Sequence, residues 1–90
     1  MVFRESLAKT TREIRELERQ LQVITVDQAR LRANIRELPP TSAAYKRYVA
    51  KFDEQETQIE KYQADVKKLQ GVEHRQKKEF DDYLANFSAE

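Results

Sequence analysis

The chain has 90 residues, of which 39% are hydrophobic and 37% are charged, with one Gly, two Pro and no Cys. This composition excludes a core several layers deep but allows a narrow apolar seam between two helices, and the absence of Cys excludes disulfides and cysteine-based metal or thiol chemistry. The formal net charge of +1 indicates no particular partner. No apolar run reaches membrane-spanning length and no signal peptide is visible, so we expect a soluble chain with no membrane partner and an unknown compartment.

The first predicted helix covers about residues 3–38. Its apolar residues recur in alternating steps of four and three, which is the pattern of a coiled-coil seam. Nine of the eleven seam positions hold large apolar residues, and these positions are 3, 7, 10, 14, 17, 21, 24, 28, 31, 35 and 38. Val2, Val23 and Val26 fall outside the seam, where isolated apolar residues are ordinary.

A turn at residues 39–41 ends this helix. Pro39 and Pro40 supply no backbone N–H, and each disfavours a helical conformation in the residue before it. The side-chain oxygen of Thr41 or Ser42 then offers an N-terminal cap for a second helix. Because the connection is short, we expect the second helix to fold back antiparallel along the first, the alternative being an open pair of helices held apart by partners.

The second predicted helix covers about residues 42–87, and its seam continues at positions 45, 48, 52, 55, 59, 62, 66 and 69 with several aromatic residues. Folding about the two prolines predicts that residues whose numbers sum to about 80 lie opposite each other. Gly71 predicts a kink or a break, because Gly inside a helix costs about 1 kcal/mol relative to Ala. The predicted neighbours include Ile35 with Tyr45, Leu21 with Ile59, and Ile14 with Val66.

Beyond residue 69 the seam weakens. Glu73 and Gln76 occupy seam positions opposite Leu7 and Phe3, so we expect this open end of the hairpin to be loose. Apolar residues return near the C-terminus, where we expect no partner within the chain, and an exposed apolar stripe of this kind usually marks an interaction site. A second copy would cover the stripe in a helical bundle dimer, as would another domain of a longer parent chain. The stripe consists of Phe80, Tyr83, Leu84 and Phe87.

Two glutamines interrupt the apolar seam. Gln28 and Gln55 lie about one helical turn apart in the simple register. They form either a buried polar layer that fixes the alignment of the helices, as polar seam residues do in coiled coils, or two side chains that lean out to water.

Charge is uneven along the chain. Residues 79–90 contain Glu79, Asp81, Asp82 and Glu90 without a basic residue, whereas residues 28–51 contain one acidic residue, Glu37. Opposite charges at the two ends favour head-to-tail pairing of two hairpins. The basic tip also suggests an alternative function as a nucleic-acid-binding arm, although Tyr45 and Tyr48, the residues suited to base stacking, occupy seam positions. The tip residues are Arg30, Arg32, Arg36, Lys46, Arg47 and Lys51.

No arrangement of residues indicates catalysis, a metal or a cofactor. His74 is the single histidine, and it lies on a helix without the converging ligands that a metal needs. Asp81 and Asp82 point to different helix faces, so they do not form an acid–base pair. We therefore expect a protein that is not an enzyme.

The residues around the tip resemble the C-terminal helical hairpin of the mucoidy-inhibitor-A-like bacterial proteins. Most of the weight rests on the run Asp27-Gln28-x-x-Leu31-Arg32-x-Asn34. The resemblance implies that the chain is a piece of a longer bacterial protein of unknown function, and that the β-domain of this parent chain is the alternative partner to a second copy. It assigns no catalytic or ligand-binding residues. The similar segments are DQARLRANI at 27–35, LP at 38–39, YKRYV at 45–49, QETQIE at 55–60 and YLANF at 83–87.

Together these patterns predict an all-α fold, an antiparallel two-helix coiled-coil hairpin. We expect a non-enzymatic structural or protein–protein interaction module, such as a coiled-coil stalk or an oligomerisation segment.

Overall fold

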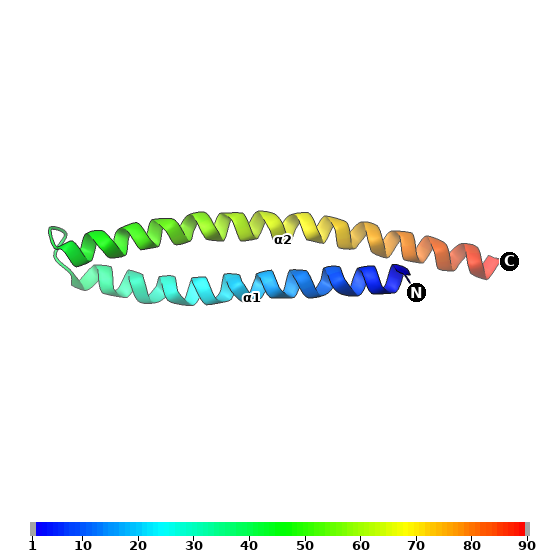
Figure 1. Ribbon diagram of the computed structural model, residues 1–90, viewed down its shortest axis with the longest axis horizontal. Coiled ribbons are helices and arrows are strands. Elements are labelled where there is room, and N and C mark those ends of the chain that lie inside the picture. The colour runs from blue at the N-terminus through cyan, green and yellow to red at the C-terminus, as the bar shows by residue number, and fades with distance from the viewer. Residues whose placement is uncertain (1, 90) are drawn as a thin grey trace.

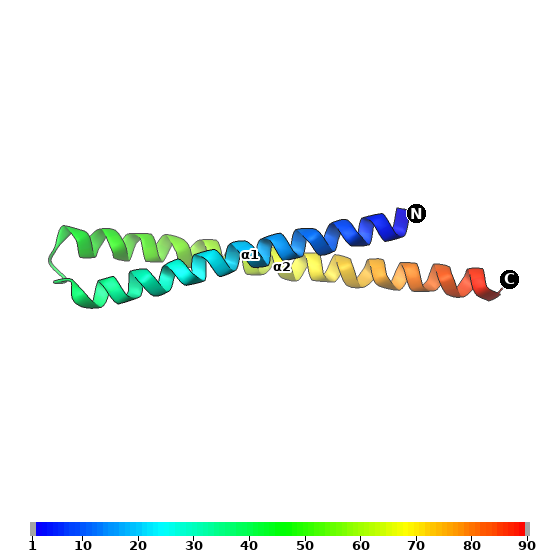
Figure 2. The same ribbon diagram turned by 90° about the horizontal axis from the view of Figure 1, so that it is seen from below.

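The computed structural model describes residues 2–89, with side-chain surroundings given for residues 3–87, so Glu90 of the predicted acidic end lies outside the described residues. Helix α1 spans Val2–Glu37 and helix α2 spans Ala43–Ala89. They lie antiparallel, with the turn at one end and both termini at the other (Figure 1), and they cross in projection when the molecule is rotated (Figure 2). The rod measures 73 × 15 × 14 Å. The predicted all-α coiled-coil hairpin is therefore confirmed.

The turn is closed by Ser42, which settles the choice between the two predicted caps. Its Oγ accepts a hydrogen bond from the Tyr45 N–H at 3.1 Å, and its own N–H donates to the Pro39 carbonyl at 3.0 Å. The first bond satisfies one of the N–H groups that the first turn of a helix leaves without a partner. Helix α2 consequently begins one residue later than predicted, and α1 ends one residue earlier.

The seam follows the predicted positions closely. Every seam position from 3 to 38 is buried or half-buried, as is every seam position from 45 to 80. Ile14 and Leu31 are buried most completely among the apolar residues, at 6% and 0% exposed. Val23 and Val26, which the periodicity placed outside the seam, are 54% and 60% exposed.

The register differs from the predicted sum of about 80. Glu73 was predicted to lie opposite Leu7. Its Oε2 instead accepts a hydrogen bond at 2.9 Å from Oγ1 of Thr11, which lies one turn further along α1. The numbers of the residues in contact across the two helices add up to about 83 on average. Side chains lean toward the N-terminus of their own helix, so those of α1 lean away from the turn and those of α2 lean toward it. Two side chains that meet therefore have numbers that sum to more than 80.

Of the kink or break predicted at Gly71, the break is wrong, because helix α2 continues through this residue. Half-buried apolar residues lie on both sides of it, at Leu69 and Val72. Packing of this kind contributes more to helix stability than the propensity of one residue. A Cβ placed on Gly71 would meet nothing within 4 Å, so nothing within the hairpin requires glycine at this position.

The open end is more closely packed than expected. The rings of Phe3 and Tyr83 lie 5.3 Å apart between centroids, and Thr10 is buried, with its Oγ1 donating to the Ser6 carbonyl at 3.1 Å. Tyr83 thus has a partner on α1, contrary to the expectation that the whole stripe lacks one. Helix α2 has 47 residues against 36 in α1, and its last turns extend beyond the start of α1 (Figure 1).

Candidate interaction surfaces and the buried polar layer

The two seam glutamines are buried rather than turned to water. Gln28 is 5% exposed and Gln55 is 7% exposed. Gln28 Nε2 donates to Glu56 Oε1 at 2.7 Å, and Gln55 Nε2 donates to Asp27 Oδ2 at 2.6 Å. Each glutamine thus binds the carboxylate next to the other glutamine. The result is a reciprocal polar layer, defined here as Asp27, Gln28, Gln55 and Glu56.

Asp27 is the most highly connected member of this layer. Its second oxygen accepts a hydrogen bond from Arg30 Nε at 2.9 Å, and Lys51 Nζ lies 3.9 Å from Oδ2. The hydrogen bond from Arg30, followed by that from Gln55, lowers the pKa of Asp27, because both bonds favour the ionised carboxylate. The carboxylate therefore remains ionised and available to Gln55 at neutral pH.

Sequence reasoning missed Asp27 and Glu56. The signal was the mirrored order of the pairs, Asp27-Gln28 on the first helix and Gln55-Glu56 on the second. Antiparallel helices bring such mirrored pairs together, whereas the register of about 80 did not place the two glutamines in one layer.

One atom of the layer is not satisfied. Within residues 3–87, the buried Gln55 Oε1 has no hydrogen-bond partner, and the same holds for Gln76 Oε1 nearer the open end. A buried carbonyl oxygen without a partner loses its bond to water without replacement. The seam therefore carries two destabilising polar atoms, one on either side of its longest apolar stretch.

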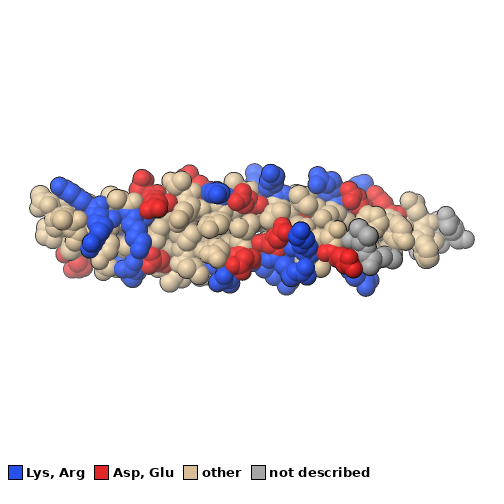
Figure 3. Space-filling model, in the orientation of Figure 1, with Lys and Arg blue, Asp and Glu red and all other residues tan. Residues whose placement is uncertain are grey.

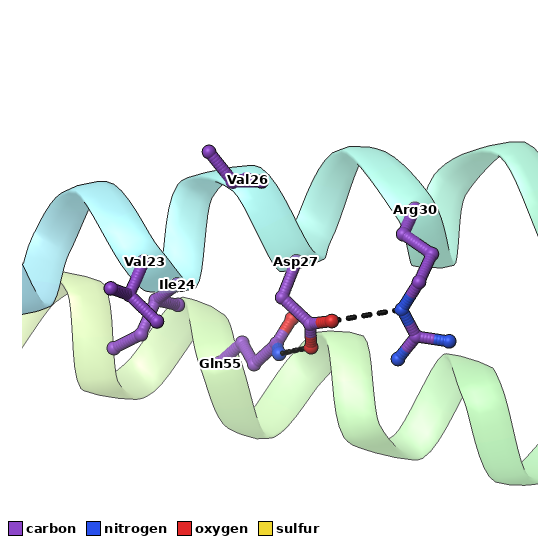
Figure 4. A pocket seen from close by; sticks show the side chains of 6 residues that line it. All are labelled: Val23, Ile24, Val26, Asp27, Arg30 and Gln55. Atoms are coloured by element: carbon purple, nitrogen blue, oxygen red, sulfur yellow. Dashed lines mark hydrogen bonds and ion pairs between the residues drawn. The ribbon is translucent and has the colours of Figure 1, made fainter.

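A shallow groove runs beside the polar layer. It is a solvent-open hollow of about 380 Å³ lined by six residues, and it is drawn in Figure 4. Val23 and Ile24 lie side by side at one end, Val26 points away from α2, and the Asp27 carboxylate is held between Gln55 and Arg30. We call this the α1 groove, and its residues are Val23, Ile24, Val26, Asp27, Arg30 and Gln55.

The predicted apolar stripe becomes more exposed along α2. Phe80 is half-buried, Tyr83 is 38% exposed, Leu84 is 41% exposed and Phe87 is 69% exposed. The rings of Tyr83 and Phe87 stack at 6.3 Å between centroids. We call residues 83–87 the α2 overhang, because its apolar side chains lie at the end of the rod where α1 covers them least.

The six basic residues of the tip do not act as one free cluster. Arg30 and Lys51 both approach Asp27, while the guanidinium groups of Arg32 and Arg47 lie 5.6 and 5.9 Å from the ring centroids of Phe52 and Tyr48. Figure 3 shows basic side chains gathered on this face near the turn, with acidic ones beside them. Two exposed cations, Arg36 and Lys46, have no ion-pair or ring partner in the described part of the chain.

The acidic end is partly compensated. Lys78 Nζ lies 3.4 Å from Asp82 Oδ2, and these residues line a second solvent-open hollow on α2 with Lys77, Asp81 and the exposed His74. Across residues 2–89, no group of three or more His, Cys, Asp or Glu side chains is placed to hold a metal ion. Neither helix, as described, has the length and apolar content needed to cross a membrane.

Comparison with known proteins adds no identity. No family model matches the chain, no curated protein matches it, and no solved structure matches it. The resemblance to the mucoidy-inhibitor-A-like family therefore stays a prediction.

Proposed function

We propose that the chain is a non-enzymatic structural module that associates with a second copy of itself through the α2 overhang. The observation that carries this proposal is the exposure of Leu84 and Phe87, at 41% and 69%, at the end of an otherwise highly charged rod. Adjacent exposed apolar side chains favour burial against another surface. In a longer parent protein, the same surface would serve an oligomerising coiled-coil stalk.

The architecture supports a structural role over a catalytic one. Within the described residues, a single seam between two helices leaves no interior volume that could shield a reaction from water, and the two hollows described above are open to solvent. The rod does provide a long and narrow spacer, 73 Å by about 15 Å. Such a shape suits a module that sets distance and presents a binding end.

Sedimentation equilibrium of the full 90-residue chain tests the proposal. We expect a dimer for the unmodified chain and a monomer for the double variant Leu84→Gln and Phe87→Gln, which leaves Tyr83 in contact with Phe3. Val49→Gln is the matched control, because Val49 is also exposed, at 40%, but lies near the turn. A monomeric unmodified chain, or a double variant that dimerises as well as the control, would contradict self-association.

Nucleic-acid binding is a second candidate function, favoured by the two exposed and unpartnered cations Arg36 and Lys46. Fluorescence anisotropy with mixed RNA and DNA at low salt tests it. Binding that weakens steeply with salt, and is abolished by Arg36→Glu with Lys46→Glu, would support a role in gripping phosphate. Flat titrations at low salt would exclude this function for the chain.

A further inference from the structure

Resting on the proposed self-association, we propose that the α2 overhang of each copy lies in the α1 groove of the other, in an antiparallel dimer with twofold symmetry. The surface assigned to bind the overhang is the exposed side of α1 around Val23 and Val26. The molecule that binds in the groove is a second copy of this chain. The apolar surfaces, the charges and the geometry of the rod each support this choice.

The apolar surfaces match in kind. Apart from Val49, the large apolar residues exposed on the described chain fall into two groups, Val23 with Val26 on α1 and residues 83–87 on α2. Val23 and Val26 are one turn apart, so they form one small patch. Within one molecule these two groups cannot meet, because they lie far apart along a straight rod (Figure 1).

The charges are also complementary. Asp27 in the groove is approached by both Arg30 and Lys51, so the three side chains carry a net positive charge. Around the overhang, the three α2 carboxylates Glu79, Asp81 and Asp82 exceed the two nearby α2 cations, Lys77 and Lys78, which already pair with Glu73 and Asp82. An overhang approaching the groove therefore brings net negative charge toward net positive charge, an attraction that salt would weaken.

The geometry allows both contacts at once. With a register of about 83, Val26 is level with residue 57 of α2, which places the groove about 40 Å from Leu84 at 1.5 Å per residue. In two antiparallel rods related by a twofold axis, bringing one overhang to one groove brings the second overhang to the second groove. Because stable interfaces bury about 1,200–2,000 Å² in total, this doubling matters, as one contact of a few side chains is too small.

The middle of such a dimer coincides with an unexplained residue. The point halfway between level 57 and Leu84 falls at residues 70–71, and Gly71 is the residue whose small size has no purpose within the hairpin. A residue without a side chain leaves room at this level for the partner rod. The same geometry places Val49 beyond the end of the partner's α2, outside the shared length.

Two solution experiments on the full chain test this arrangement. In the first, Val23→Gln with Val26→Gln is compared by sedimentation equilibrium with Val49→Gln. We expect the groove variant to raise the dissociation constant at least tenfold and the control to leave it within about twofold, with helix content by circular dichroism unchanged in both. A dimer that depends on Leu84 and Phe87 but forms normally in the groove variant would overturn this inference while leaving the proposed function intact. An unmodified chain that is a monomer would overturn both.

The second experiment uses the absence of natural cysteine. A copy with Ala29→Cys is mixed with a copy with Asn86→Cys and oxidised, both positions being exposed and next to the proposed contact. We expect a mixed disulfide to form at least tenfold faster than from the control Arg15→Cys, which lies about 21 Å further along α1. Equal rates for the two positions, or a product dominated by two Asn86→Cys copies joined to each other, would overturn the twofold arrangement.

Discussion

The reciprocal polar layer makes a test possible in which two nearly equivalent residues should respond differently. The exposed fractions of Gln28 and Gln55 are 5% and 7%, and each side chain donates one hydrogen bond of 2.6–2.7 Å to a carboxylate. They differ in one atom, because the Gln55 Oε1 has no partner among residues 3–87. Replacement of each glutamine by leucine should therefore separate the effect of this oxygen from everything that the two sites share.

The expected changes in the free energy of unfolding follow from general values for hydrogen bonds and for the burial of apolar side chains. Either substitution loses a hydrogen bond to a charged group, which contributes about 1.5–3 kcal/mol, and gains a buried leucine, which contributes a similar amount. Leucine and glutamine have nearly equal helix propensities, so the helix itself adds little. We expect Gln28→Leu to be close to neutral. Gln55→Leu also removes the unpaired oxygen, so we expect it to raise the free energy of unfolding by about 1–3 kcal/mol over Gln28→Leu.

Urea titration followed by circular dichroism at 222 nm measures the difference. Both substitutions should be made in the Leu84→Gln and Phe87→Gln background, so that dimerisation does not contribute to the apparent stability. Equal effects of the two leucines, or greater stabilisation by Gln28→Leu, would refute the argument from the unpaired oxygen. A changed slope of the titration would indicate a changed fold and not a changed stability.

Three further predictions concern single positions. Gly71→Ala should raise the free energy of unfolding by about 1 kcal/mol in the same monomeric background, since the added Cβ meets no atom within 4 Å, and a loss of stability in urea titration would contradict this. Ser42→Ala should lower stability by about 0.5–2 kcal/mol through loss of the cap to Tyr45, whereas Ser42→Asp should keep most of it; equal losses would argue against capping. Hydrogen bonds from Arg19 and then Gln20 lower the pKa of Glu16 from 4.5 to about 2. Because this pKa is lower in the folded chain, the stabilisation is complete above about pH 4.5 and is lost as the pH falls toward 2. An NMR titration of the Glu16 carboxyl carbon should show the low value, and Arg19→Gln should move it back toward 4.5; an unshifted titration would contradict the ion pair.

The fold could be predicted because its determinants are local. A period of three and four identifies a seam without knowledge of the partner helix, and two consecutive prolines stop a helix whatever surrounds them. The register could not be predicted as precisely, because a count from the turn treats helices as lines. The direction in which side chains lean enters twice in an antiparallel pair, once for each helix, and moves the contacts by about three residue numbers.

The parts of the candidate site that escaped prediction depend on this same offset. The register of about 80 paired Phe3 with Gln76, so the contact of Phe3 with Tyr83 went unseen. Glu56 and Asp27 lie just outside the seam, where a charged residue looks like any other solvated one. The prediction of a break at Gly71 was wrong for a different reason. The low helix propensity of glycine was given more weight than the packing of the residues on both sides of it.

The turn at the two prolines also determines the order in which the rod opens and closes. The contact between Arg32 and the Phe52 ring, nearer the turn, encloses about 20 residues of chain, whereas that between Phe3 and Tyr83 encloses about 80, a difference in loop-closure entropy of about 1 kcal/mol. Folding should therefore begin at the turn and proceed toward the termini, and thermal fraying should begin at the termini. The overhang lies at this last-formed end, so a partner bound there would clamp the segment that opens first.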